Sequence, residues 1–210
     1  MKLIKPNFEI LTPIDGVQIL KDIEIAGRTC YKSEDKITED SAQQFVKMIL
    51  GRAHESVIEH KSITVKFICD RGVSHELVRH RLASFSQEST RYCNYSKNKF
   101  DNELTFIFPE WLKNVIETDT AVQTYHLVLE HAEKAYLKLL ELGWQPQQAR
   151  AVLPNSLKTE VVVTANLREW RTILKQRTGT AAHPQMRELM VPLLSELKTK
   201  IPIIFDDITT

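Results

Sequence analysis

The spacing of hydrophobic residues predicts most of the helices of this chain. Apolar side chains recur every three or four positions over Gly16 to Ala26, over Thr38 to Leu50 and over Thr118 to Leu142, the longest such stretch. This is the period of a helix that buries one face. Gly143 follows the longest stretch as a helix-ending residue, and Pro184 to Lys200 predicts a further amphipathic helix.

A different period predicts the strands. Ser62 to Cys69 alternates between apolar and polar residues, which is typical of a half-buried strand, and Thr159 to Thr164 is rich in β-branched residues. Between them we expect a short helix from Val73 to Arg81, and a loop or short strand over the polar, aperiodic Ser84 to Ser96. Strands mixed irregularly with helices, without repeats or linkers, predict one α+β domain over residues 1–210.

Composition narrows the class of protein. The chain has 210 residues, of which 42% are hydrophobic and 26% charged, as in a soluble domain with a packed core. A net charge of +1 provides no global basic field for nucleic acid, so a cluster of positive charge must serve a local purpose. The amino terminus lacks the apolar region of a secretory signal, and no uncharged stretch reaches the length of a membrane span.

The cysteines predict a cytoplasmic protein with reduced thiols. Cys30, Cys69 and Cys93 are odd in number and widely spaced, which does not suit a disulfide framework. No Cys-x-x-Cys pair is present, so the sequence offers no cysteine zinc site. We expect neither a membrane nor nucleic acid among the partners of this protein.

The segment RHRLASFSQESTRY, residues 79–92, gathers positive charge in a nearly neutral chain. Arg79 and Arg81 flank His80, and Arg91 follows on a polar stretch of serines and a glutamine. Such groups repel one another, whereas the planar fork of arginine suits phosphate and carboxylate oxygens. The polar side chains could fix the edge of a planar heterocycle. The segment therefore predicts a site for anionic small molecules.

Other interpretations of this segment remain open. It could be a solvated basic loop whose arginines pair with carboxylates such as Glu76 and Glu88. An RNA-binding loop is disfavoured because few aromatic residues interleave the charges. A nucleophilic Ser89 with His80 as its base is disfavoured too, because two neighbouring cations oppose protonation of the imidazole and no Gly-x-Ser-x-Gly elbow is present. A serine that donates a hydrogen bond to phosphate is the simpler role.

A second motif, HESVIEH, covers residues 54–60. It is not the zinc motif HExxH, because Ile58 stands at the second histidine position. His54 and His60 lie six positions apart and do not share a helix face, so we expect a polar turn and no metal. A metal-dependent hydrolase that uses these two histidines and His183 remains an alternative. A binding role for His54 and Ser56 is open.

The third motif, NLREWRTILKQRTG, covers residues 166–179. Asn166 and Glu169 form a capping-box pattern, which alone explains both residues. Arg168 in the first turn opposes the helix dipole, so we expect an anion or an acidic partner nearby. Arg177 lies on the apolar stripe, which turns its stem inward, either toward a ligand or to satisfy the last carbonyls. Arg150 also enters an apolar region, and no GxGxxG or Walker pattern is present.

Together these motifs resemble the signature of the flavin-dependent thymidylate synthases. The likeness begins with Arg79-His80-Arg81, followed after seven residues by Ser89 and then by Arg91-Tyr92. It extends upstream to His54-x-Ser56-x-x-Glu59-His60, and downstream to Arg150 and to Asn166 to Arg177. The combination covers most of the chain and is far more specific than Arg-His-Arg alone.

The resemblance implies an α+β domain with helices and a small antiparallel sheet, assembled as a homotetramer. FAD would lie at subunit interfaces, in sites built from several chains. The implied reaction is the reductive methylation of dUMP to dTMP in de novo dTMP synthesis. In it, 5,10-methylenetetrahydrofolate would give the one-carbon unit and NADPH would reduce the flavin.

The resemblance also implies roles for single residues. FAD would be bound by His54, Ser56, Arg79, His80, Arg81, Gln87, Asn166, Leu167, Arg168 and Thr172. The nucleotide dUMP would be bound by Glu76, Arg79, Gln87, Ser89, Arg91, Arg150 and Arg177. Of these, Arg177 would be catalytic: it would face the uracil and stabilise negative charge as N3 of the ring ionises. Arginine does not readily lose its proton, so it would act as an electrostatic stabiliser and not as a base.

Three positions depart from the family pattern. Gln87 stands where the family often has glutamate, and Glu76 stands where it often has glutamine, so that acid and amide have exchanged places. Thr172 stands where an asparagine often helps to hold FAD. These departures leave the contacts of the three side chains open, but not the class of reaction.

Overall fold

The computed structural model describes residues 1–210, apart from the side chain of Lys99, and shows an α+β fold. The chain forms two compact units, each built from three segments. The first unit comprises Met1–Asn7, Phe67–Arg79 and Ser86–Val161. The second unit comprises Phe8–Lys66, His80–Phe85 and Val162–Thr210.

The main sheet has four strands in the order β2 (Asn7–Ile10), β3 (Ser62–Asp70), β6 (Lys158–Asn166) and β4 (Ala83–Gln87). Strands β3 and β6 run antiparallel. The hydroxyls of Thr64 and Thr164 lie 2.9 Å apart, and the Leu167 N–H donates to the Lys61 carbonyl at 2.8 Å. Alternate residues of β6 are buried, as the sequence pattern predicts for a strand. Both long strands predicted from the sequence are confirmed, and each supplies residues to both units.

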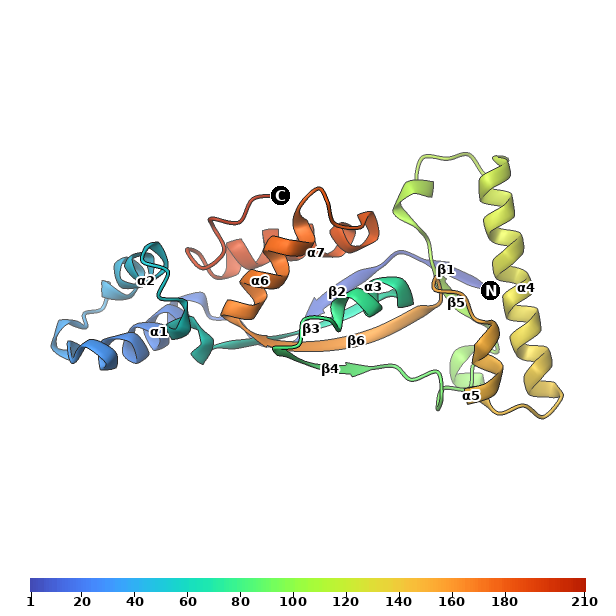
Figure 1. The fold of residues 1–210 in the computed structure, drawn as a ribbon, viewed down its shortest axis with the longest axis horizontal. Coiled ribbons are helices and arrows are strands. Elements are labelled where there is room, and N and C mark those ends of the chain that lie inside the picture. The colour runs from blue at the N-terminus through green and yellow to red at the C-terminus, as the bar shows by residue number, and fades with distance from the viewer. The chain divides into compact units, whose positions relative to one another are not determined.

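The second unit contains four helices. They are α1 (Gly16–Tyr31), α2 (Ser41–Gly51), α6 (Leu167–Thr178) and α7 (Pro184–Lys200), joined by 3-10 turns η1 (Glu34–Lys36) and η2 (Glu55–His60). Helix α7 packs beside α6, and α1 packs beside α2 (Figure 1). The fully buried Trp170 of α6 donates its indole N–H to the Ile63 carbonyl at 2.9 Å, which fastens the helix to β3. Gly16 begins α1 where a Cβ atom would collide with the Lys200 carbonyl.

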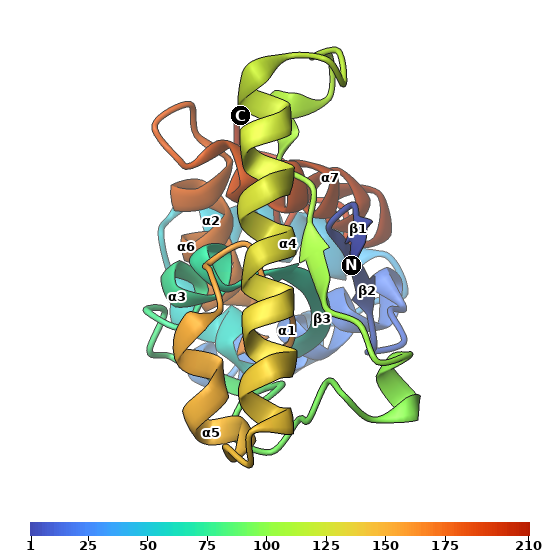
Figure 2. The ribbon, with the colours of Figure 1, turned by 90° about the vertical axis from the view of Figure 1, so that its right-hand side faces the viewer.

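The first unit is built around the long helix α4 (Thr120–Glu141), which Figure 2 shows along its length with α5 (Pro146–Ala149) beside its carboxyl end. Strand β1 (Lys2–Ile4) pairs in parallel with β5 (Thr105–Ile107). Helix α3 (Arg71–Leu77) and the 3-10 turns η3 (Asn98–Phe100), η4 (Glu110–Leu112) and η5 (Arg150–Val152) complete the unit. Its core joins aromatic and aliphatic side chains, among them Tyr95, Phe106, Leu129, Tyr136 and Leu157.

The predicted elements differ from the observed ones mainly at their ends. The short helix expected over Val73 to Arg81 begins at Arg71, where Asp70 caps it, and ends at Leu77, so His80 lies outside it. The segment expected as a loop or short strand holds β4 and then turns. Among the described residues, no helix is both long and apolar enough to cross a membrane.

Candidate functional site

The residues singled out in the sequence fall into two groups, one in each compact unit. The first unit carries Glu76, Arg79, Gln87, Ser89, Arg91 and Arg150. The second unit carries His54, Ser56, His80, Arg81, Asn166, Leu167, Arg168, Thr172 and Arg177. All the residues expected to bind dUMP, except Arg177, therefore lie in the first unit. All those expected to bind FAD, except Arg79 and Gln87, lie in the second.

The amino terminus of α6 is built by residues that the sequence predicts there. The Asn166 side chain accepts a hydrogen bond from the Glu169 backbone N–H at 2.9 Å, which confirms the predicted cap. The Glu169 carboxylate does not complete a capping box, because it lies beside His80. The Leu167 side chain is buried in the core and its N–H donates to the Lys61 carbonyl, so its contact with FAD stays a prediction.

Arg168, in the first turn of α6, has an acidic partner. Its Nη1 lies 2.6 Å from Glu59 Oε1, and its Nε lies 3.8 Å from Glu55 Oε2. Both carboxylates belong to η2, and they offset the placement of a cation at the positive end of the helix. The expectation of an anion or acidic partner near Arg168 is thus met within the chain. A phosphate that binds here must compete with Glu59 for the guanidinium.

Three further polar side chains of the second unit, those of His54, Ser56 and Thr172, are exposed. His54 is exposed at the start of η2, and its Nδ1 lies 2.9 Å from the Tyr31 hydroxyl. Ser56, two residues later, is exposed as well. The Thr172 hydroxyl donates to the Arg168 carbonyl at 3.3 Å and is also exposed. These side chains can reach a ligand without leaving the surface of their unit.

A buried contact joins the Arg-His-Arg segment to the carboxyl end of α6. Arg177 Nε donates to His80 Nε2 at 3.0 Å, and His80 Nδ1 lies 3.6 Å from Glu169 Oε1. His80 and Glu169 are each 7% exposed. Burial lowers the pKa of His80, and the charge of Arg177 lowers it further, while burial raises the pKa of Glu169. His80 is therefore neutral and serves as an acceptor for Arg177.

This contact bears on two expectations. Arg177 turns inward, as its place on the apolar stripe predicts, and its Nε donates to the His80 side chain. The His80 imidazole points toward Arg177 and Glu169, and the expected contact of this residue with FAD stays a prediction. The partnership with Glu169 was missed by sequence reasoning, because the helix cap already explained that residue.

In the first unit, the loop at residues 89–91 collects part of the predicted phosphate site. The Ser89 hydroxyl accepts from the Arg91 N–H at 3.3 Å, and Arg150 Nη1 donates to the Thr90 hydroxyl at 3.1 Å. Arg91 and Arg150 are both exposed. Ser89 and Arg91 belong to this loop and Arg150 contacts it through Thr90, so these three residues lie near one segment, while their binding of a phosphate stays a prediction. Arg79 is also exposed.

Two other first-unit residues have partners that bear on the sequence hypotheses. Gln87 Nε2 donates to the hydroxyls of Ser74 and Thr159, at 2.9 and 3.2 Å, which fixes the amide that replaces the usual acid. Glu88 accepts from Lys158 and from the Tyr95 hydroxyl. Glu88 is thus occupied within the first unit by groups other than the arginines with which a solvated basic loop would pair it.

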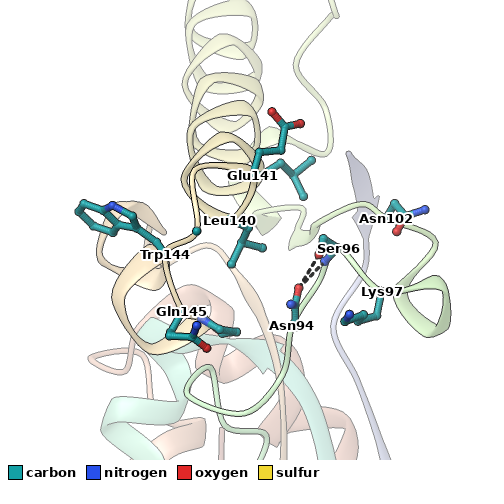
Figure 3. A pocket seen from close by; sticks show the side chains of 11 residues that line it. Asn94, Ser96, Lys97, Asn102, Leu140, Glu141, Trp144 and Gln145 are labelled. Atoms are coloured by element: carbon teal, nitrogen blue, oxygen red, sulfur yellow. Dashed lines mark hydrogen bonds between the residues drawn. The ribbon is translucent and has the colours of Figure 1, made fainter.

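A pocket of about 520 Å³ lies elsewhere in the first unit, at the carboxyl end of α4 (Figure 3). Trp144 and Gln145 border it on one side, and Asn94, which is hydrogen-bonded to Ser96, borders it on the other. None of the predicted site residues is among the described residues that line it. Within the described part of the chain, no group of three or more His, Cys, Asp or Glu side chains could hold a metal ion.

Comparison with known proteins connects these residues to a family. Residues 16–203 match the family model described as thymidylate synthase complementing protein. A flavin-dependent thymidylate synthase of Corynebacterium aurimucosum is 35% identical over 200 residues, covering 88% of this chain and 78% of the relative. That of Pyrococcus furiosus is 30% identical over 186 residues, covering 88% and 74%. That of Mycobacterium bovis is 32% identical over 220 residues, covering 98% and 85%.

A solved structure has the same fold. The UMP/dUMP methylase PolB from Streptomyces cacaoi, bound with 5-Br dUMP, superposes with a TM-score of 0.77. The match covers 98% of this chain and 96% of that chain at 21% identity. At this identity the likeness concerns the fold and not the ligand.

Proposed function

The chain belongs to the thymidylate synthase complementing protein family, the flavin-dependent thymidylate synthases, and we propose from this premise how its residues divide the work. It is a methyltransferase that converts dUMP to dTMP with FAD as its cofactor. When bound, FAD supplies the hydride-carrying chemistry of this reaction. In our proposal 5,10-methylenetetrahydrofolate is the one-carbon donor and NADPH is the source of reducing equivalents.

The donors of the second unit fit a cofactor with a pyrophosphate. Arg168 is exposed in the first turn of the 12-residue helix α6, and η2, which packs against α6, carries the exposed Ser56 and follows the exposed His54. A helix amino terminus and a guanidinium are both suited to phosphate oxygens. Glu59 holds Arg168 until the phosphate replaces it. We assign FAD to His54, Ser56, Arg81, Asn166, Leu167, Arg168 and Thr172, together with Arg79, His80 and Gln87.

The loop at residues 89–91 supports a site for the phosphate of dUMP. Ser89 and Arg91 belong to this loop, and Arg150 donates to its Thr90 hydroxyl, so the segment offers a hydroxyl and two exposed arginines. Arginine binds phosphate in two-point contacts, so this loop would fix the position of the nucleotide. We assign Glu76, Arg79 and Gln87 to the remainder of dUMP. The amide of Gln87 is already oriented by Ser74 and Thr159.

Arg177 is the residue we assign to catalysis, and its bond to a neutral His80 is the observation that carries this assignment. The guanidinium is half-buried, and its Nε donates to a neutral acceptor at 3.0 Å, which fixes its orientation. Placed at the uracil, it would stabilise the anion that forms when N3 ionises. A preorganised donor of this kind contributes roughly 3 kcal/mol to the transition state.

Assembly and location complete the proposal. We propose that residues 1–210 act as one domain and that four copies form the enzyme, because many of the assigned FAD ligands are exposed on a single chain. A second copy would enclose them. We also propose a cytoplasmic location, since the three cysteines are free thiols.

The test is the formation of dTMP by purified protein supplied with dUMP, methylenetetrahydrofolate, NADPH and FAD, measured by mass spectrometry. We expect a yellow protein whose flavin absorbance is bleached by NADPH, and we expect dTMP. Arg177→Ala should lower kcat by about 10²- to 10³-fold with FAD still bound. The control is Arg52→Ala, at an exposed arginine of the second unit outside the assigned site, which should keep full activity.

Two results would contradict the proposal. If protein loaded with FAD forms no dTMP, the assignments of residues to FAD binding, dUMP binding and catalysis are all contradicted. If Arg177→Ala retains the activity of the unaltered protein, its assignment to catalysis fails while the binding assignments stand.

A further inference from the structure

Three side chains in contact join the catalytic arginine to the first turn of its own helix. Arg177 lies in the last turn of α6 and Glu169 in the first, and His80 lies beside both of them. We propose that His80 and Glu169 are positioning residues for Arg177, with Glu169 selecting the imidazole tautomer that allows His80 to accept the Arg177 Nε–H. The proposal rests on the proposed role of Arg177 and goes beyond it.

The donor chemistry of arginine fixes the tautomer. A guanidinium has only N–H donors and stays protonated in proteins. With Arg177 Nε 3.0 Å from His80 Nε2, that ring nitrogen must present its lone pair. A neutral imidazole then carries its proton on Nδ1. Glu169 Oε1 lies 3.6 Å from this Nδ1, so it is the oxygen that faces the proton.

Burial makes this arrangement selective. His80 and Glu169 are each only 7% exposed, so water has little access to replace either partner. In the other tautomer, Nε2–H would point at the Nε–H of Arg177, and two donors would oppose each other. Burial and the charge of Arg177 lower the pKa of His80, which keeps the doubly protonated ring from forming at neutral pH. The carboxyl group at Nδ1 is therefore what favours the productive form.

The location of His80 adds a consequence for the ligand-binding arginines. Arg79 and Arg81 on either side of it are exposed, whereas His80 is buried. The buried His80 therefore fixes the segment to its unit, and the side chains of Arg79 and Arg81 are accessible to ligands. The family resemblance implies that all three residues bind FAD, and this stays our assignment. The geometry adds a second role for His80, as the acceptor for Arg177.

The experiment compares variants that remove each acceptor with variants that keep it. His80→Leu removes the acceptor for Arg177, and Glu169→Leu removes the carboxyl group that faces Nδ1–H. His80→Gln and Glu169→Gln each retain an oxygen at the corresponding place. We expect the leucine variants to lower kcat for dTMP formation about tenfold or more with little change in KM for dUMP, and the glutamine variants to recover most of it.

A control separates positioning from loss of folding. Thr178→Val removes another buried hydrogen bond of α6, from the Thr178 hydroxyl to the Leu174 carbonyl, at a residue outside the assigned site. We expect it to lower the melting temperature without the selective fall in kcat. FAD absorbance, measured for every variant, reports whether the cofactor site survives.

A spectroscopic measurement keeps the proposal testable if a leucine variant fails to fold. The protein is labelled with ¹⁵N-histidine and measured by NMR. The signal that is missing in the His80→Gln spectrum belongs to His80. The ¹⁵N chemical shifts of this signal show which ring nitrogen carries the proton. We expect the proton on Nδ1 in the unaltered protein. A proton on Nε2 would overturn the proposal.

The kinetic outcomes distinguish this inference from the proposed function. Unchanged kcat in both leucine variants, with Arg177→Ala strongly impaired, would overturn the positioning roles and leave the role of Arg177 intact. Full activity of Arg177→Ala would overturn both. A lower kcat in the leucine variants, with most of the kcat recovered in the glutamine variants, supports the positioning roles of His80 and Glu169.

Discussion

Among single residues, His80 has the most constrained state, because its bond to Arg177 requires an uncharged ring. Burial first, and the Arg177 charge second, lower its pKa below the ordinary value of 6.5. The unfolded chain has neither influence. As the pH falls below about 6.5, the unfolded state therefore binds a proton that the folded state still refuses, and the free energy of unfolding decreases.

This sign gives a prediction. Between pH 7.5 and pH 5.5 the unaltered protein should lose more thermal stability than His80→Gln, whose amide does not titrate. Glu169, the charged group facing the Nδ1 side of the ring, is present in both proteins, so its own raised pKa affects them in the same direction. The measurement is the melting temperature of each protein at the two pH values. An equal loss in both would show that His80 does not titrate as described.

Residue types and spacing predict a set of site residues, which stays a prediction, but they do not show which side chains these residues contact. The inward turn of Arg177 followed from its place on the apolar stripe of α6. The contacts of His80 with Arg177, and of Gln87 with Thr159, join residues that are distant in the sequence. Periodicity carries no information about such contacts, because it describes only local structure.

At the scale of elements, α6 organises the second unit. Its stripe buries Trp170 and its first turn meets η2 through Arg168. Its middle is fixed by the buried Arg171, whose guanidinium contacts Asp207, Glu55 and the Ile204 carbonyl. The helix thus ties the carboxyl-terminal residues and η2 together. Arg171 was not predicted as a structural link, because a charged residue within a helix gives no sign of its partners.

The cap of α6 allows folding and binding to be separated. Asn166→Asp keeps a good N-cap and should leave the free energy of unfolding nearly unchanged, whereas Asn166→Ala should lower it by about 1 kcal/mol. The aspartate nevertheless adds a negative charge where we place the pyrophosphate of FAD. We expect Asn166→Asp to weaken FAD binding clearly, as measured by flavin fluorescence titration, while urea unfolding shows a stable apoprotein.

A matched substitution controls for the cap itself. Asp15 caps α1 by accepting from the Gln18 N–H at 2.9 Å, away from the assigned site. Asp15→Asn should affect stability as little as Asn166→Asp does, with unchanged affinity for FAD. If Asn166→Asp binds FAD as well as the unaltered chain, the pyrophosphate does not lie at this helix end.

Long periodic elements were predicted well and short ones were not. Helix α7 begins and ends where the sequence indicated, and α4, β3 and β6 agree within a few residues. Strands β1, β2 and β5 have three or four residues each, and α5 has four. Such segments are too short to display a period, and tertiary contacts decide their structure.

At the scale of the whole molecule, assembly into a tetramer is our prediction. Leu82, Tyr92 and Ile116 are large apolar side chains that are more than 70% exposed. We expect light scattering of the FAD-loaded protein to give about four times the 24.3 kDa mass of one chain. A fully active protein with the mass of a single chain would contradict the proposed tetramer.

The sequence motifs predicted the family, and the fold class followed from the mixture of periods. The division into two compact units could not be read from the sequence. Strands β3 and β6 each cross from one unit to the other, so no linker or change of composition marks a boundary. That the 210 residues act as one domain stays a prediction, and the two shared strands support it.

The central claim is that Arg177 acts on the uracil of dUMP while Arg91 and Arg150 hold its phosphate. A crystal structure of the complex with FAD and dUMP tests it most directly. We predict that the Arg177 guanidinium lies within hydrogen-bonding distance of the uracil ring, that it keeps its bond to His80, and that the phosphate lies on the loop at residues 89–91. A nucleotide bound with its phosphate elsewhere and its base out of reach of Arg177 would contradict the account.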